Sequence, residues 1–150
     1  MEEKRVKIGA AQSVPLIREM ITDSAIKEVL DEPCQWLVIK ARRDKMKPYQ
    51  ADKLNLATSI LAERLAGVHI VYSTDRQAVI DQIKEHLRPV KLKYIYGKHL
   101  GHNTVWWTYR TRRPYGNDYC YTLTEDEVLR INLAIEDIVS RLRRIEVVAE

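Results

Sequence analysis

Between residues 35 and 87 the chain alternates short apolar runs with longer segments of helical periodicity, and this alternation limits the folds open to it. Gln35–Ala41 and Val68–Ser73 have the length and apolar character of buried strands. An amphipathic segment follows each of them, over Pro48–Gly67 and Thr74–Leu87. Successive strands joined by helices pair in parallel with right-handed crossovers. This region therefore predicts a β-α-β-α unit.

From residue 90 the pattern changes to three apolar and aromatic runs separated by short loops. Val90–Gly97, Thr104–Thr111 and Asp118–Leu123 alternate in the manner of strands, and short loops require antiparallel neighbours. Apolar stripes with helical spacing precede and follow the predicted strands. They predict one or two helices from Ser13, and a last helix that begins at Thr124 and continues to about residue 147. The predicted fold class is α+β: a mixed sheet of about five strands (β-α-β-α-β, then an antiparallel meander) with N-terminal and C-terminal helices packed on it. Residues 1–150 form a single globular domain.

Aromatic rings and positive charges gather in one stretch of the chain. Arg88–Tyr121 holds eight of the eleven aromatic residues and seven of the 25 Lys and Arg residues, with a single acid, Asp118. The net charge of the whole chain is only +4, so the distribution of charge matters more than its total. Cations interleaved with flat rings are typical of surfaces that bind single-stranded nucleic acid.

Alternation along the predicted strands assigns these side chains to one outward face of the sheet. The predicted nucleic-acid-binding residues are Lys91, Lys93, Trp106, Arg110 and Arg112, extended at the edges by Lys98, Arg113 and Tyr115. The alternative interpretation is an ordinary solvated face with Trp106 covered by the protein itself. A second basic run, Lys40 to Lys47, precedes the Pro48 helix and could extend the surface.

The last helix carries an apolar heptad seam, formed by Val128, Ile131, Ile135, Ile138, Leu142 and Ile145. Such a seam either covers a face of the same chain or pairs two copies. We expect the first, and a homodimer through the C-terminal helix is the alternative.

Catalytic signals are weak. The five glycines are scattered, so no phosphate-binding loop is predicted, and the acids form no trio that would hold a catalytic metal ion. His99 and His102, with Cys120, are too few for a structural zinc site. The sequence predicts no catalytic residue, cofactor or metal. We expect a non-catalytic nucleic-acid-binding accessory protein; the alternatives are a metal-dependent nuclease or nucleic-acid-processing enzyme, and a self-assembling structural protein.

The expected location is the cytoplasm. Two cysteines, Cys34 and Cys120, cannot form a disulfide framework, and the N-terminal residues run into no apolar signal core. No apolar run approaches the roughly 20 residues of a membrane span.

Tyr72–Gln77 resembles the stretch around the nucleophilic serine of serine recombinases, which also stands at a strand-to-helix junction. In that family an arginine lies two residues before the serine, whereas Val71 occupies the position here. The match spans about six residues in mid-chain. A capping box accounts for Thr74 and Gln77, so no recombinase role is assigned to Ser73.

Overall fold

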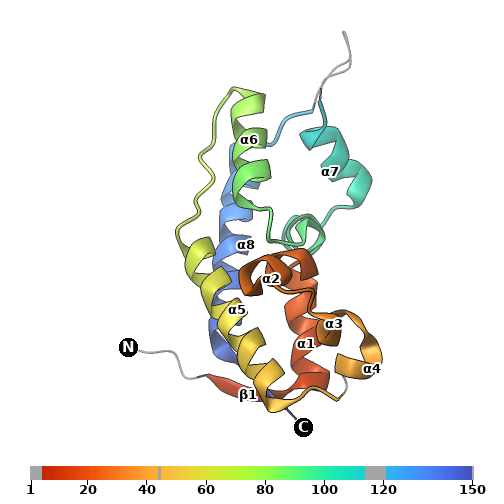
Figure 1. Ribbon diagram of the computed structural model, residues 1–150. Helices are drawn as coiled ribbons and strands as arrows, with labels where there is room; N and C mark the ends of the chain where they lie inside the picture. The colour runs from red at the N-terminus through yellow and green to blue at the C-terminus, as the bar shows by residue number, and fades with distance from the viewer. Residues whose placement is uncertain (1–4, 44, 114–120, 150) are drawn as a thin grey trace.

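The computed structural model describes residues 5–43, 45–113 and 121–149, which are mostly helical (Figure 1). The elements in chain order are β1 (Val6–Gly9), α1 (Ala10–Met20), α2 (Asp23–Leu30), α3 (Gln35–Val38), α4 (Lys40–Arg43), α5 (Pro48–Ala66), α6 (Arg76–His86), η1 (Tyr94–His99), α7 (Thr104–Thr111), α8 (Glu125–Arg144) and β2 (Ile145–Val148). Within these ranges, no helix combines the length and the apolar content needed to cross a bilayer.

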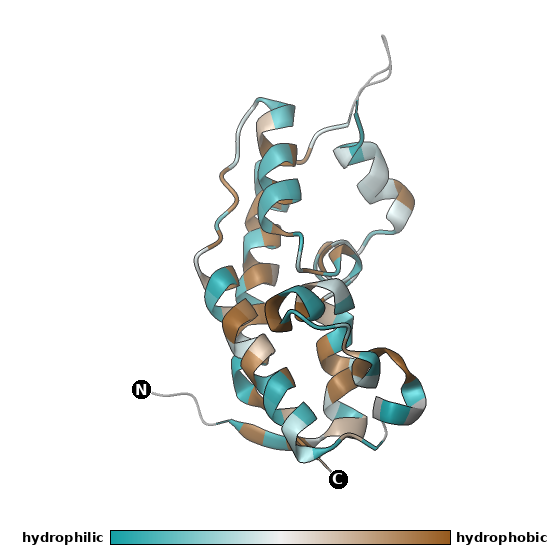
Figure 2. Cartoon of the chain, in the orientation of Figure 1, coloured by the Kyte–Doolittle hydropathy of each residue, from teal (hydrophilic) through white to brown (hydrophobic). Residues whose placement is uncertain are grey.

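The core forms where α8 packs against α5 and η1. Figure 1 shows α5 and α8 running in opposite directions side by side. Both helices carry hydrophilic and hydrophobic residues along their length, as amphipathic helices do (Figure 2). Ile131 and Ile138 of α8, and Leu54 of α5, have no exposed surface, and each such side chain contributes about 1.5–3 kcal/mol by leaving water.

The only sheet in the described residues is a parallel pair, in which Val6 of β1 lies opposite Ile145 of β2. β2 follows directly on α8. The Asn55 side chain of α5 pairs with β2: its amide donates to the Val147 carbonyl at 2.9 Å and accepts from the Val147 N–H at 2.8 Å.

The predicted mixed sheet of about five strands is therefore wrong. The Gln35–Ala41 run forms α3 and the start of α4, after Cys34 in the left-handed conformation with φ of 50°. Trp36 and Leu37 are buried whereas Val38 and Ile39 are exposed. A short continuous apolar run fits a buried helical turn as well as a strand, and here the helical turn forms.

The Val68–Ser73 run is not a strand either, although it is an extended connection in Figure 1. Asn132 of α8 donates to the Ile70 carbonyl and accepts from its N–H, both at 2.8 Å. Gln82 of α6 does the same for Val71, at 2.9 and 2.8 Å. Side-chain amides thus supply the hydrogen bonds that a neighbouring strand would have made.

The predicted meander is replaced by helical segments. Val90 makes one isolated bridge with Ile21, and η1, a π-helix, follows. Thr104–Thr111 is α7, which begins where the Asn103 side chain accepts a hydrogen bond from the Trp106 N–H at 3.0 Å. The third predicted strand lies partly outside the described residues, and residues 121–123 have no regular structure.

The long helices agree better with prediction. α5 begins at Pro48 and is capped by Gly67, and the Thr124–Glu127 capping box is present at the start of α8. The N-terminal stripe forms two helices, α1 and α2. Two predicted caps are wrong: Ser13 lies inside α1, and Asp75 rather than Thr74 caps α6.

The heptad seam of α8 is used within the chain. Val128, Ile131, Ile135, Ile138 and Leu142 are all buried, at 2% exposure or less. The interpretation that the seam covers the same chain is confirmed, with helices rather than a sheet beneath it. The seam is therefore not available to a second copy.

Candidate nucleic-acid interface

Trp106 and Arg110 come together because α7 is a helix. Residues four apart lie about one turn apart on the same side of a helix, whereas in a strand they would share a face but lie about 13 Å apart. The Arg110 guanidinium carbon lies 4.1 Å from the centre of the Trp106 ring, and Arg110 Nη1 donates to the Trp106 carbonyl at 3.3 Å.

The other face of Trp106 is covered too. The His102 ring stacks on the indole at 3.9 Å with an angle of 7° between the ring planes. Two groups that are each about 4 Å from one ring centre would collide on a single face, so His102 and Arg110 lie on opposite faces. The half-buried Trp106 therefore has both ring faces occupied by side chains of the same chain.

The contacts of Trp106 continue into a larger group. Arg110 also lies 5.0 Å from the Tyr121 ring, Tyr121 meets Tyr109 edge-on at 6.1 Å, and the Arg112 guanidinium lies 5.2 Å from the Tyr109 ring. We call this group the α7 cluster: His102, Trp106, Tyr109, Arg110, Arg112 and Tyr121. Unlike Trp106, Tyr109 and Tyr121 are exposed, at 44% and 46%.

Arg76 of α6 ties the two chain segments of the α7 cluster together. Its guanidinium donates to the carbonyl of Arg112 at 2.6 Å and to that of Tyr121 at 2.9 Å, with a longer bond of 3.5 Å to Tyr109. Arg113, the next residue in the chain after Arg112, is exposed. Across residues 5–43, 45–113 and 121–149, none of Arg76, Arg110, Arg112 and Arg113 forms an ion pair. Arg112 Nε is buried without a hydrogen-bond partner among them.

The remaining predicted site residues are dispersed. Lys98 is paired with Glu19 at 2.8 Å and covers the Tyr94 ring at 5.3 Å. Lys91 is half-buried near Asp23, Lys93 is exposed, and Tyr115 lies outside the described residues. Of the eight predicted residues, the structure therefore brings together Trp106, Arg110 and Arg112, with Arg113 next in the chain.

A second basic surface lies where α3 and α4 face the start of α5. It is a groove of about 690 Å³, which we call the α3–α5 groove, lined by Glu32, Pro33, Cys34, Gln35, Trp36, Arg42, Lys45, Lys47, Tyr49, Gln50 and Lys53. Four of these residues are cations and one, Glu32, is an acid. The basic run is apparent in the sequence, whereas Tyr49 and Lys53 belong to the helix that follows it and join the groove only in the folded chain.

Glu32 is fully engaged within the groove. Its carboxylate accepts from Lys53 Nζ at 2.8 Å, from Trp36 Nε1 at 3.3 Å and from Cys34 Sγ at 3.7 Å. The hydrogen bond from Lys53 lowers the pKa of Glu32. Burial, aided by the nearby Glu32 charge, raises the pKa of Cys34 to about 11, so this thiol is protonated and is a poor nucleophile at neutral pH.

A polar network fixes η1 against α8. The Tyr94 hydroxyl donates to Asp137 Oδ2 at 2.7 Å, His99 Nε2 lies 3.0 Å from the same oxygen, and Arg141 donates to Oδ1 at 3.0 Å. Burial would raise the pKa of Asp137, but the hydrogen bonds from Tyr94, Arg141 and His99 outweigh it and lower that pKa. Burial and the bond to Asp137 raise the pKa of Tyr94 to about 12.

These contacts also separate the two histidines considered as metal ligands. His99 faces Asp137, whereas His102 stacks on Trp106. In the part of the chain that the structure describes, no three His, Cys, Asp or Glu side chains could share a metal ion. Cys120 lies outside that part.

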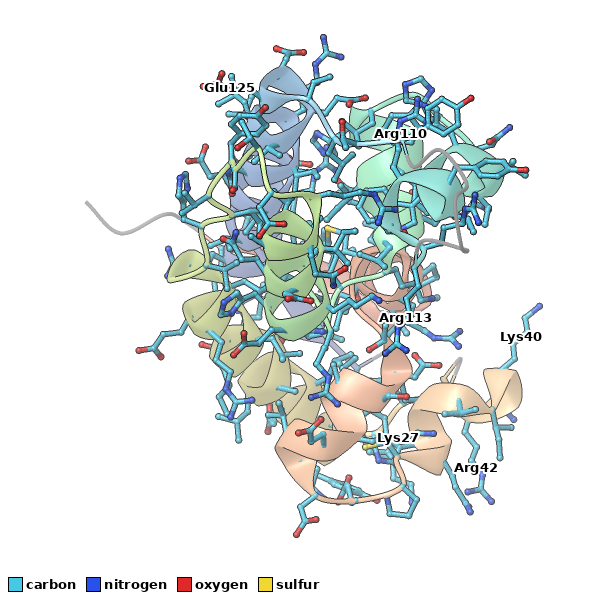
Figure 3. All side chains as sticks on the ribbon, turned by 90° about the horizontal axis from the view of Figure 1, so that it is seen from above. Lys27, Lys40, Arg42, Arg110, Arg113 and Glu125 are labelled. Atoms are coloured by element: carbon cyan, nitrogen blue, oxygen red, sulfur yellow. The ribbon has the colours of Figure 1, made fainter. Side chains whose placement is uncertain are left out.

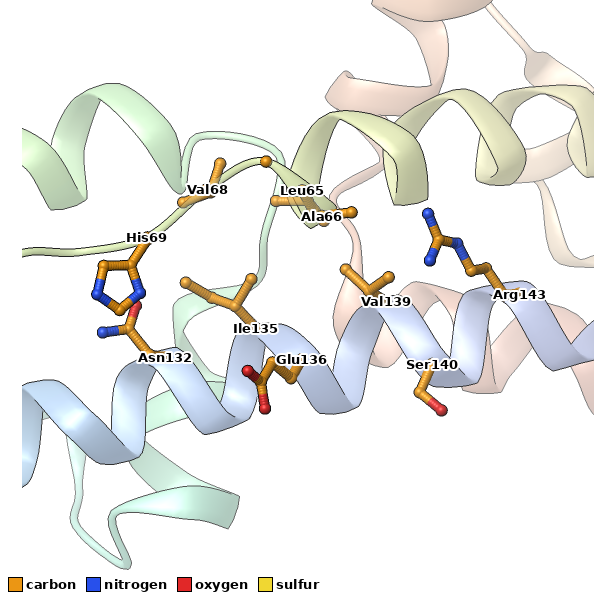
Figure 4. Close-up of a pocket in the computed structure, with 11 residues that line it drawn as sticks. Leu65, Ala66, Val68, His69, Asn132, Ile135, Glu136, Val139, Ser140 and Arg143 are labelled. Carbon is orange, nitrogen blue, oxygen red and sulfur yellow. The ribbon is translucent and has the colours of Figure 1, made fainter. Parts of the chain in front are cut away.

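Another hollow, of about 400 Å³, lies between the end of α5 and α8 (Figure 4). Its floor includes Ile135 and Val139, and its charged residues, Glu136 and Arg143, have opposite signs. The α3–α5 groove differs in having an excess of positive charge. Comparison of the chain with protein families, with curated proteins and with solved structures gives no match.

Proposed function

We propose that this protein binds single-stranded nucleic acid through the α7 cluster and Arg113, as a non-catalytic accessory protein of the cytoplasm. The observation that supports the proposal is the coincidence of three arginines, Arg110, Arg112 and Arg113, that make no ion pair within the described residues with two exposed tyrosine rings. A flexible polyanion supplies both of the groups that such a surface binds, phosphates and flat bases.

The stacked arginines suit phosphate recognition. A guanidinium that rests on a ring is held in one orientation, and its remaining N–H groups can donate in pairs to phosphate oxygens. Because Arg110 is already ordered by Trp106, it loses little conformational entropy on binding. In this proposal Trp106 supports Arg110 and does not itself stack on a base.

The exposed rings account for the preference for single strands. Base–aromatic stacking contributes roughly 1–3 kcal/mol per base, and it requires bases that are not already stacked in a duplex. Tyr109 and Tyr121 have the exposure for this role. In both DNA and RNA the unpaired base offers the same π-face, so the proposal covers both.

The test is the affinity for a labelled single-stranded oligonucleotide, measured by fluorescence anisotropy. We expect the double variant Tyr109→Ala/Arg113→Gln to bind at least about tenfold more weakly, because it loses one stacking ring and one phosphate contact. The control, Lys7→Gln/Lys84→Gln, removes two exposed positive charges elsewhere, one more than the Tyr109→Ala/Arg113→Gln variant does. Circular dichroism checks that both variants are folded. Equal affinities in the parent and the Tyr109→Ala/Arg113→Gln variant would reject the site, and a parent that does not bind at low ionic strength would reject the function.

A further inference from the structure

The α3–α5 groove presents positive charge that no acid of the described residues neutralises, apart from Lys53, which pairs with Glu32. The Arg42 side chain donates a hydrogen bond to the neutral Gln35 at 3.0 Å. Arg42, Lys45 and Lys47 form no ion pair with any acid of the described segments, and all three are exposed. Figure 3 shows Arg42, with Lys40, projecting from α4 away from the body of the molecule.

An aromatic ring accompanies these charges. Tyr49, in the first turn of α5, is 54% exposed, and Lys53 Nζ lies 5.8 Å from its ring centre. Glu32 holds Lys53 at 2.8 Å, so the lysine beside the ring has a fixed position. The groove thus combines an exposed ring with cations on one concave surface.

We propose that the α3–α5 groove is a second contact for the same nucleic-acid strand that the α7 cluster binds. This inference rests on the proposed function. Phosphates of the strand lie against Arg42, Lys45 and Lys47, and a base stacks on Tyr49. A concave groove lined by polar side chains fits a flexible chain of phosphates better than it fits the flat surface of a membrane.

The positions of the two sites allow one strand to reach both. Figure 1 shows α7 and α4 at the upper and lower ends of the same, right-hand side of the molecule, so a strand that contacts both sites must span the distance between them. Once one site is occupied, the other meets the strand at a high effective concentration, so two modest contacts give a tight complex. The consequence is a dependence of affinity on strand length.

The experiment compares single strands of about 6 and about 24 nucleotides, which bracket the usual site sizes of single-strand-binding folds. We expect the parent to bind the long strand at least about tenfold more tightly than the short one. Lys45→Gln/Lys47→Gln and Tyr49→Ala should each lower the affinity for the long strand and reduce this length advantage. The Lys7→Gln/Lys84→Gln variant, with the same loss of charge as the lysine pair, should keep it.

The outcomes separate this inference from the proposed function. A parent that binds both lengths, with a length advantage unchanged in the groove variants, overturns the second contact and leaves the α7 cluster as the binding site. A parent that binds neither length overturns both. The last measurement is binding of the protein to vesicles with anionic headgroups. Stronger binding to vesicles than to oligonucleotide at equal phosphate concentration would assign the groove to a lipid surface and overturn the inference.

Discussion

The α7 cluster and the α3–α5 groove are both rich in rings and positive charge, but they hold them differently. In the α7 cluster, Arg110 lies on Trp106, and Arg76 of α6 donates to backbone carbonyls of cluster residues. In the groove, Lys45 and Lys47 are exposed and make no ion pair in the described residues. Amino-acid composition therefore shows where charge lies along the chain. The contacts of each charged side chain decide whether it stabilises the fold or remains available to a ligand.

The two arrangements should respond differently to substitution. Side chains that pack on rings and carbonyls contribute to the free energy of unfolding. Exposed lysines contribute little to folding but release counterions when they meet phosphates. Stability measurements should therefore be sensitive to the α7 cluster, and salt-dependent affinity should be sensitive to the groove.

The largest effect is expected from truncating one ring in each region. Trp106→Ala should lower the free energy of unfolding by about 2–3 kcal/mol, because it removes a half-buried ring together with its stacking on His102 and Arg110. Tyr49→Ala, at a ring that is 54% exposed, should stay within about 0.5 kcal/mol of the parent. Urea denaturation measures both. Equal losses of unfolding free energy in the two variants would contradict the proposed difference between the two regions.

A smaller effect is expected from exchanging one arginine in each region. Arg76→Gln should cost about 1–2 kcal/mol, since the carbonyls of Arg112 and Tyr121 lose a charged donor. Arg42→Gln, which removes a single exposed hydrogen bond to Gln35, is the matched control and should be neutral. If Arg42→Gln lowered the free energy of unfolding more than Arg76→Gln, the groove would contribute more to stability than the α7 cluster, contrary to this prediction.

The salt dependence of oligonucleotide affinity provides the reverse test. For a single strand each phosphate-contacting cation contributes about 0.7 to the slope of log K against log salt, so Lys45→Gln/Lys47→Gln should reduce the slope by about 1.4. Its stability should be unchanged. Lys7→Gln/Lys84→Gln should leave the slope at the parent value, and a reduction in that variant would indicate a general charge effect.

The smallest effect is expected outside the two regions, at Asp137 of α8. Asp137→Asn should cost about 1 kcal/mol at pH 7, because the carboxylate binds Tyr94, His99 and Arg141. The pKa of Asp137 is lowered in the folded protein, so its contribution is present above the ordinary value of 3.8 and is lost as the pH falls through the folded value. Urea titrations from pH 7 to acid should therefore show parent and variant converge. A constant difference at every pH would mean that the charge is not the cause.

Parts of this fold follow from the sequence and parts do not. α5 and α8 are predictable because long apolar stripes begin and end at recognisable caps, such as Pro48 and Thr124. Thr104–Thr111 looks like a strand because its β-branched and aromatic residues favour one, yet the Asn103 cap and tertiary packing make it α7. Residues 68–73 are extended as expected, but their partners, Asn132 and Gln82, come from distant helices that no local pattern reveals.

The candidate interface divides in the same way. Its composition can be predicted from the sequence, because aromatic residues and cations are concentrated between Arg88 and Tyr121. Its contacts are not, because Arg76 enters from another helix and Trp106 is covered on both faces. For the α3–α5 groove, the basic run is apparent in the sequence, but its proximity to Tyr49 arises only when the chain folds.

The side-chain amides that bind extended backbone are also sites where slow deamidation would damage the fold. Asn55, Gln82 and Asn132 each offer a donor and an acceptor to one residue, and hydrolysis of the amide would leave a carboxylate that cannot donate and that repels the facing carbonyl oxygen. Asparagine and glutamine are among the thermolabile side chains. Prolonged heating should therefore damage the protein first where these helices hold β2 and residues 70–71, as a slow chemical change rather than a reversible melting.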